Sequence, residues 1–158
     1  MPSLPSAGVL LYRRPTQPGR TGVEVLIGHM GGPFWARKDA GGWSIPKGEY
    51  HPEEDPLAAA RREFAEELGQ PVAALDLTAL GSITTSRGKV ISVWAAEADL
   101  DVTTAVSNTF TLEWPRGSGI MAEFPELDRV AWVPLADARA RLVKSQVPFL
   151  DRLLGELS

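Results

Sequence analysis

Three glutamates on one predicted helix are the residues whose spacing most directly indicates chemistry. Glu63, Glu66 and Glu67 stand at positions i, i+3 and i+4 of the apolar-periodic run 56–68, so their carboxylates share one helix face. Like charges at these spacings destabilise a helix by about 0.2–0.5 kcal/mol per pair. Mg²⁺ typically takes one or two carboxylates together with waters and phosphates. The spacing therefore leaves two interpretations open, a Mg²⁺ site and a solvated acidic face.

The acidic helix is part of a longer pattern of glycines and charges. In order, this pattern is Gly48, five residues, Glu54, seven residues, Arg62-Glu63-Phe64, one residue, Glu66-Glu67, one residue and Gly69. The spacing resembles the Nudix box, the signature of the Nudix (MutT-type) hydrolases. Gln70 stands where the box normally ends in a bulky aliphatic residue, and Glu53 replaces a glycine that often precedes its first glutamate. We expect Val72 to supply the missing apolar contact.

The resemblance extends beyond the box and implies a fold. Residues 43–48 resemble the W-x-x-P-K-G approach of Nudix members that handle nucleotide polyphosphates, whereas residues 102–118 match only weakly. The stretches near 94–95 and 123–126 resemble a small group of bacterial members and imply no particular substrate. The implied fold class is α/β, a Nudix-type α/β/α sandwich with a mixed β-sheet in which the box forms a loop–helix–loop catalytic motif. We expect a single Nudix hydrolase domain over residues 1–158.

The resemblance also implies roles for the charged residues of the box. The expected ligands of Mg²⁺, for which Mn²⁺ could substitute, are Glu63, Glu66, Glu67 and the carbonyl of Gly48. Glycine at position 48 permits a close backbone approach to the metal. Glu54 is expected to support the metal-bound waters, and Arg62 to orient the glutamates by salt bridges, one of them to Glu66 four residues on.

A further glutamate is expected from a loop before the last strand. Nudix enzymes often place one there, a short distance ahead of a tryptophan, and Glu126 stands six residues before Trp132. Glu126 is therefore a candidate catalytic and metal-binding residue, with Glu123 in reserve. Each has a plain alternative as an exposed loop carboxylate, and the sequence leaves open which glutamate acts as the general base.

Cations and aromatic residues outside the box are candidates for substrate contacts. Lys47, Arg87 and Lys89 could bind phosphates, although the latter two are equally well explained as solubilising surface charges. The aromatic residues in or beside predicted loops, on which a base could stack, are Trp35, Trp43, Tyr50, Trp114 and Phe124. Because most tryptophans serve the core, only one or two of these are expected to meet substrate, with Trp43 and Tyr50 preferred. His51 is expected to be an exposed histidine.

The resemblance implies a Mg²⁺-dependent hydrolase that cleaves the pyrophosphate linkage of a nucleoside diphosphate joined to another group. Dinucleoside polyphosphates such as diadenosine tetraphosphate are the first expected substrates, from the approach at residues 43–48. Damaged or noncanonical nucleoside triphosphates come second and nucleotide sugars third. A non-catalytic nucleotide-sensing module is the alternative from another class, which the full set of box glutamates disfavours. A purely structural acidic domain would leave the like-charge cluster unexplained.

The elements that must position these residues follow from periodicity and turn signals. Runs 7–14 and 23–29 predict a hairpin around the turn 15–20, and runs 77–85 and 89–97 predict another around 86–88. A short strand at 43–45 must stop at Pro46, and 129–134 reads as the last strand. Helices are expected at 56–68, capped by Asp55 and ended by Gly69, and at 135–144 and 148–154. The segment 103–125 stays unassigned.

Composition bounds the function classes. The 158 residues carry 16 basic and 20 acidic side chains, a net charge of −4, and no cysteine, which excludes disulfides and thiolate metal sites. Two histidines are too few for a histidine-built metal site. The net acidity disfavours duplex nucleic acid, yet seven acids and two bases lie between Glu49 and Glu67. The expected partner is a small nucleotide held through a cation, with no membrane segment, a cytoplasmic location, and either a monomer or a homodimer.

Overall fold

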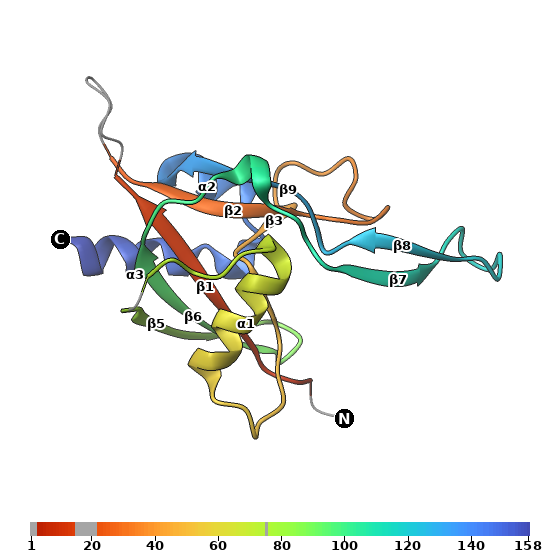
Figure 1. Cartoon of the computed structure of the whole chain (residues 1–158), viewed down its shortest axis with the longest axis horizontal. Helices are drawn as coiled ribbons and strands as arrows, with labels where there is room; N and C mark the ends of the chain where they lie inside the picture. Colours follow the sequence, from red (N-terminus) through yellow and green to blue (C-terminus); the bar gives the residue numbers. More distant parts are fainter. Residues whose placement is uncertain (1–2, 15–21, 75) are drawn as a thin grey trace.

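The computed structural model of the chain, which describes residues 3–14, 22–74 and 76–158, is built around a seven-stranded mixed sheet (Figure 1). Its strands are β1 (Ser6–Arg13), β2 (Glu24–Met30), β3 (Trp43–Ser44), β4 (Lys47–Glu49), β5 (Thr78–Thr84), β6 (Val90–Glu97) and β9 (Leu127–Pro134). They follow the order β3-β2-β1-β6-β5, with β4 paired to β1 and β9 paired to β2. Only the β1–β6 pair is parallel among these described pairings. The mixed sheet confirms the predicted fold class.

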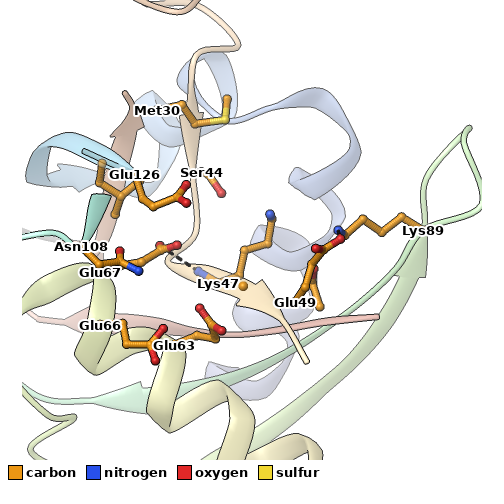
Figure 2. A pocket seen from close by; sticks show the side chains of 13 residues that line it. Met30, Ser44, Lys47, Glu49, Glu63, Glu66, Glu67, Lys89, Asn108 and Glu126 are labelled. Carbon is orange, nitrogen blue, oxygen red and sulfur yellow. Dashed lines mark hydrogen bonds and ion pairs between the residues drawn. The ribbon is translucent and has the colours of Figure 1, made fainter. Parts of the chain in front are cut away.

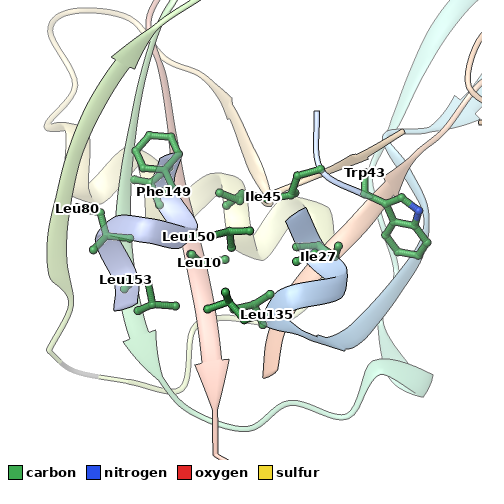
Figure 3. Close-up of a cluster of buried hydrophobic side chains, with 14 of the residues drawn as sticks. Leu10, Ile27, Trp43, Ile45, Leu80, Leu135, Phe149, Leu150 and Leu153 are labelled. Carbon is green, nitrogen blue, oxygen red and sulfur yellow. The ribbon is translucent and has the colours of Figure 1, made fainter. Parts of the chain in front are cut away.

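Helices cover both faces of the sheet and complete three layers. The helices are α1 (Pro56–Leu68), α2 (Leu135–Arg141) and α3 (Pro148–Leu157), with short 3-10 turns η1 (Val102–Thr104) and η2 (Lys144–Gln146). Side chains alternate along β1, so Val9 packs in the core under α1 while Leu10 packs with the side chains of α2 and α3. Figure 3 shows Leu10 beside Leu150 and Leu153 in that second core.

Helix α1 begins and ends where local signals predict. Asp55 accepts a hydrogen bond from the backbone N–H of Ala58 at 3.0 Å, and Pro56 occupies the first turn. Gly69 adopts a left-handed conformation with φ of 74°, and its N–H donates to the carbonyl of Ala65. Because only glycine takes this conformation without strain, the helix stops there. The buried face of α1 includes Ala60, Phe64 and Leu68, as its periodicity predicts.

Several boundaries differ from the sequence-based expectations. Strand β3 ends at Ser44, before Pro46 as expected since proline lacks an N–H for the ladder, and the additional strand β4 follows the proline. Strand β9 begins at Leu127, α2 ends at Arg141 and α3 continues to Leu157. The predicted turn 15–20 lies outside the described residues. Val72 is buried in the α1 core, as expected, while Gln70 donates to the hydroxyl of Thr104.

The segment left unassigned by sequence contains a projecting hairpin. Strands β7 (Thr109–Glu113) and β8 (Met121–Pro125) pair antiparallel in a separate two-stranded sheet that extends away from the body (Figure 1). Phe110 faces Phe124 across the pair, with ring centroids 6.0 Å apart. Among the described residues, no helix combines the length and the apolar character needed to cross a membrane.

Candidate active site

A cavity of about 440 Å³ lies where α1, β4 and the turn before β9 meet (Figure 2). It is lined by Ser6, Met30, Ser44, Lys47, Gly48, Glu49, Glu63, Glu66, Glu67, Lys89, Asn108, Glu126 and Leu127. Five of these residues are glutamates and two are lysines. The acidic helix and the candidate loop glutamate, far apart in sequence, therefore share one polar cavity.

Helix α1 carries three of the glutamates to this cavity. Glu63 and Glu67 are one turn apart and buried, whereas Glu66 is exposed. Figure 2 shows Glu63 and Glu66 together below the cavity and Glu67 nearer to Glu126. The apolar side of α1 is anchored by Phe64 and Leu68 in the core, which fixes the rotation of the helix and hence the face that its carboxylates present.

Arg62 ties the loop before α1 to the glutamates on the helix. Its Nε and Nη2 donate to the two carboxylate oxygens of Glu54, at 2.8 and 2.9 Å. Its Nη1 donates to Glu63 at 2.8 Å and to Glu66 at 3.2 Å, the expected i, i+4 contact. The hydrogen bonds from Arg62 hold the pKa of Glu54 below its usual range. Because one guanidinium bonds to all three carboxylates, it restricts the positions that each of them can take.

Gly48 is required by the position of Glu63. A Cβ atom at residue 48 would stand 1.8 Å from Oε2 of Glu63. Gly48 pairs with Ala7 in the sheet, so its backbone cannot easily move aside. The glycine thereby allows a strand backbone and a buried carboxylate to approach one another closely.

Burial perturbs the charged groups of the cavity. Burial raises the pKa of Glu67 to about 8, although the positive charge of Lys47 acts in the opposite direction. Burial also lowers the pKa of Lys47. The backbone N–H of Lys47 donates to Oε1 of Glu67 at 3.2 Å. Burial also raises the pKa values of Glu63 and Glu126, and the charge of Glu66 adds to the effect on Glu63. Clustered acids with raised pKa values are typical of functional sites, and a cation would stabilise their charged forms.

Glu126 enters the cavity from the turn between β8 and β9. Its carboxylate is directed toward the region occupied by Glu67 and Lys47 (Figure 2). Glu123, the reserve candidate, lies on β8 near the hydroxyl of Thr109 and is not among the residues lining the cavity. The structure thus brings Glu126, and not Glu123, to the other glutamates.

The candidate phosphate-binding cations separate into two groups. Lys47 and Lys89 line the cavity, and Nζ of Lys89 donates to Glu49 beside it (Figure 2). Arg87 lies in the turn between β5 and β6 and does not line the cavity. The assignment of Arg87 as a substrate contact therefore finds no support in the cavity.

The aromatic residues expected to stack on a base lie elsewhere. Trp43 is 4% exposed, packs in the core and donates from Nε1 to Asp39. Tyr50 is 8% exposed and packs in the core under α1. These positions correct the expectation that the two rings meet substrate, because short strand pairings and packing enclose them. The other candidates, Trp35, Trp114 and Phe124, do not line the cavity either. His51 is exposed, as expected.

Five polar or sulfur-bearing residues of the cavity were not anticipated from sequence. They are Ser6, Met30, Ser44, Glu49 and Asn108. Within the described part of the chain, the hydroxyl of Ser6 is buried without a hydrogen-bond partner, at the start of a strand whose next five residues are apolar. That polar residue at the head of an apolar run was the one available signal. Asn108 belongs to the segment whose sequence could not be assigned.

The donor set of the cavity fits a hard divalent cation, because its ligands are carboxylate and carbonyl oxygens. As the side chains stand, no three acidic or histidine residues in the described part of the chain are gathered around one metal position. Glu63 and Glu66 bond to Arg62, and Glu67 bonds to the backbone of Lys47. Each of these bonds engages the Oε1 atom of its carboxylate, so a cation could bind through the Oε2 atoms once they are directed toward a common point.

Known proteins resemble the chain in both sequence pattern and fold. A family model described as the NUDIX domain matches residues 2–153. No curated protein sequence matches the chain. Among solved structures, a Caenorhabditis elegans Ap4A hydrolase in a binary complex is similar, with 21% identity, a TM-score of 0.65, and coverage of 96% of this chain and 97% of that chain.

Two further structures support the same fold. The NUDIX domain of Shewanella oneidensis NrtR, complexed with ADP ribose, is 18% identical with a TM-score of 0.67, covering 100% of this chain and 90% of that chain. A MutT protein from Methanosarcina mazei Go1 is 19% identical with a TM-score of 0.62, covering 99% of this chain and 96% of that chain. The match of the domain model over nearly the whole chain, together with this fold and the cavity on its box, shows that the chain belongs to the Nudix family of pyrophosphohydrolases.

Proposed function

We propose that the chain is a Mg²⁺-dependent hydrolase that cleaves the pyrophosphate linkage of a nucleoside diphosphate joined to another group. The observation that carries the proposal is the single cavity in which Glu63, Glu66, Glu67 and Glu126 lie beside Lys47 and Lys89. Family members generally use divalent metal ions. An acidic cavity repels a polyanionic substrate unless a cation intervenes, and the two lysines supply only part of the charge needed.

The residues divide the work of this reaction. Glu63, Glu66, Glu67, Glu126 and the Gly48 carbonyl would hold the metal, which when bound screens phosphate oxygens and lowers the pKa of water. Arg62 keeps Glu63 and Glu66 in place through its contact with Glu54. Lys47 and Lys89 would bind phosphate oxygens outside the acidic cluster. One of these glutamates would accept the proton of the attacking water. Glu67, whose pKa burial raises to about 8, could do so only after losing its own proton.

Dinucleoside polyphosphates are the first proposed substrates. The W-x-x-P-K-G approach at residues 43–48 favours them, and the similarity to an Ap4A hydrolase agrees with this choice. Damaged nucleoside triphosphates are the second choice, in line with the similarity to a MutT protein. ADP-ribose, the ligand of the NrtR domain, represents a nucleoside diphosphate joined to a sugar.

A substrate panel tests the proposal. The full chain is incubated with diadenosine tetraphosphate, an oxidised deoxyguanosine triphosphate or ADP-ribose, with Mg²⁺ or Mn²⁺, and the products are separated by anion exchange. We expect turnover that requires the metal and is fastest with diadenosine tetraphosphate. Turnover of a triphosphate or ADP-ribose alone would change the substrate class, whereas no turnover of any compound would contradict the proposed activity.

Matched variants connect the activity to the cavity. Glu67→Gln removes a buried carboxylate and should lower kcat by about 10²–10⁴-fold, the usual contribution of acid–base catalysis. Glu156→Gln makes the same chemical change at an exposed position of α3 and should leave kcat unchanged. Equal activity of the two variants would remove Glu67 from the active site.

A further inference from the structure

The pairing of β2 with β9 is interrupted beside the cavity. His29 pairs with Arg129, but the next residue of β2, Met30, pairs with Leu127. Asp128 is therefore an extra residue on β9, the arrangement of a β-bulge. Bulges next to active sites commonly redirect a neighbouring side chain. Here the bulge directly follows Glu126 and Leu127, both of which line the cavity.

A buried histidine holds the bulged residue. The side chain of His29 is fully buried, and its Nδ1 lies 2.8 Å from Oδ1 of Asp128. Its Nε2–H donates to the carbonyl oxygen of Lys38 at 2.6 Å. The ring also packs edge-on against Trp43, with centroids 5.4 Å apart. His29 thus joins the bulge to the loop after β2, and none of these contacts belongs to the proposed chemistry.

Hydrogen bonds hold the backbone of Glu126 and Leu127, directly before the bulge. The N–H of Gly31 donates to the carbonyl of Glu126 at 3.0 Å, and the N–H of Glu126 donates to the carbonyl of Asn108 at 2.9 Å. The N–H of Leu127 donates to the hydroxyl of Ser107 at 3.0 Å. These bonds set the path of the backbone, and the contact with His29 sets the orientation of Asp128 within it.

We propose that His29 and Asp128 form a positioning pair that holds the β9 bulge so that the Glu126 carboxylate lies in the cavity. The inference rests on the proposed function, since it assigns a use to Glu126. Without the pair, the bulge can relax toward regular pairing, which shifts the strand register by one residue. Such a shift reverses the side of the sheet to which neighbouring side chains point. Glu126 would then leave the other glutamates.

Metal binding and turnover of the full chain test the pair. The variants are Asp128→Ala, Asp128→Asn, Glu126→Gln and the double variant Asp128→Ala with Glu126→Gln. The Asp128 side chain is 33% exposed, so its replacement should leave the protein folded, which thermal unfolding checks. The control Asp151→Ala removes the carboxylate of another ion pair, with Arg139, on α3. Free Mn²⁺ is measured by electron paramagnetic resonance, and kcat and KM are measured separately.

We expect Asp128→Ala to weaken Mn²⁺ binding and lower kcat by about tenfold, the usual effect of removing a group that orients a metal ligand. KM should change little, and Asp128→Asn, which keeps an acceptor oxygen toward His29, should restore most of the loss. In the Glu126→Gln background, Asp128→Ala should add no further loss. Asp151→Ala should match the wild type.

Several results would overturn the pair. One is a Mn²⁺ affinity of Asp128→Ala equal to that of the wild type. Another is a loss of affinity from Asp128→Ala that is as large in the Glu126→Gln background as in the wild type. The third is a Mn²⁺ affinity of Glu126→Gln equal to that of the wild type. If Asp128→Ala unfolds, the same comparisons are made with Asp128→Asn and His29→Gln. Failure of the proposed function is distinguishable, because a chain that cleaves no pyrophosphate still reports the pair through its Mn²⁺ affinities.

Discussion

At the residue scale, the least ordinary group is the carboxyl of Glu67. It is buried between the backbone of Lys47 and the charges of Glu63 and Glu126, and burial raises its pKa to about 8. A carboxyl that retains its proton near neutral pH cannot bind a cation without releasing that proton. Metal affinity should therefore rise with pH, since the proton and the cation compete for the same oxygens.

The same pKa gives a pH-dependent stability. The folded chain holds the Glu67 proton more tightly than the unfolded chain, whose carboxyl has a pKa near 4.5. The stabilisation is therefore complete below pH 4.5 and is lost as the pH rises through about 8. In metal-free buffer at pH 9, the melting temperature of Glu67→Gln should exceed that of the wild type. The difference between the two melting temperatures should be larger at pH 9 than at pH 5. A difference in melting temperature that is constant across this range would contradict the raised pKa.

The close approach of Gly48 and Glu63 gives a second prediction. Gly48→Ala puts a Cβ atom where the Glu63 carboxylate now lies, so kcat should fall by about 10–100-fold, as when the support of a metal ligand is lost. Gly155→Ala is the matched control, since a Cβ there meets nothing within 4 Å. Within α3 it should stabilise the protein by about 0.5–1 kcal/mol and leave kcat unchanged. Normal turnover by Gly48→Ala would show that Glu63 is free to move.

At the element scale, α1 was predictable because its signals are local. Asp55, Pro56 and Gly69 mark its ends, and the spacing of Phe64 and Leu68 fixes its buried face. The β7–β8 hairpin was not predictable, because its pairing depends on contacts between segments on either side of the turn at Trp114. Asn108, which directly precedes β7, was not predictable either, because its backbone is held beside the cavity by hydrogen bonds with Glu66 and Glu126, both distant in sequence.

The cap of α1 offers a test at this scale. Asp55→Ala removes the side-chain acceptor for the N–H of Ala58 and should cost about 1 kcal/mol of stability. For a chain of this size, that corresponds to a melting temperature lower by roughly 2–4 °C. Asp55→Asn keeps an acceptor oxygen and should retain most of the stability. Thermal unfolding measures both, and identical losses would mean that the cap bond contributes little.

For the whole molecule, the sandwich explains how an acidic chain meets a polyanion. The glutamates of α1 and Glu126, in the turn before β9, are far apart in sequence. They come together in one cavity only after the sheet has formed. The resemblance to the Nudix box predicted that Glu63, Glu66, Glu67 and Glu126 lie together, and they line one cavity. Trp43 and Tyr50 could not be placed, since strand pairing and packing, and not the local sequence, bury them. The charge of −4 thus conceals a local acidic site, at which we propose that a cation binds.

The proposed metal-dependent hydrolysis is tested by the rate at which the full chain cleaves diadenosine tetraphosphate as Mg²⁺ is titrated from a chelated, metal-free start. A metal-dependent site on α1 predicts no turnover without metal, saturable turnover as Mg²⁺ is added, and loss of that turnover in Glu67→Gln but not in Glu156→Gln. Cleavage that persists in excess chelator, or that proceeds equally in Glu67→Gln, would contradict a metal-dependent site built on the glutamates of α1.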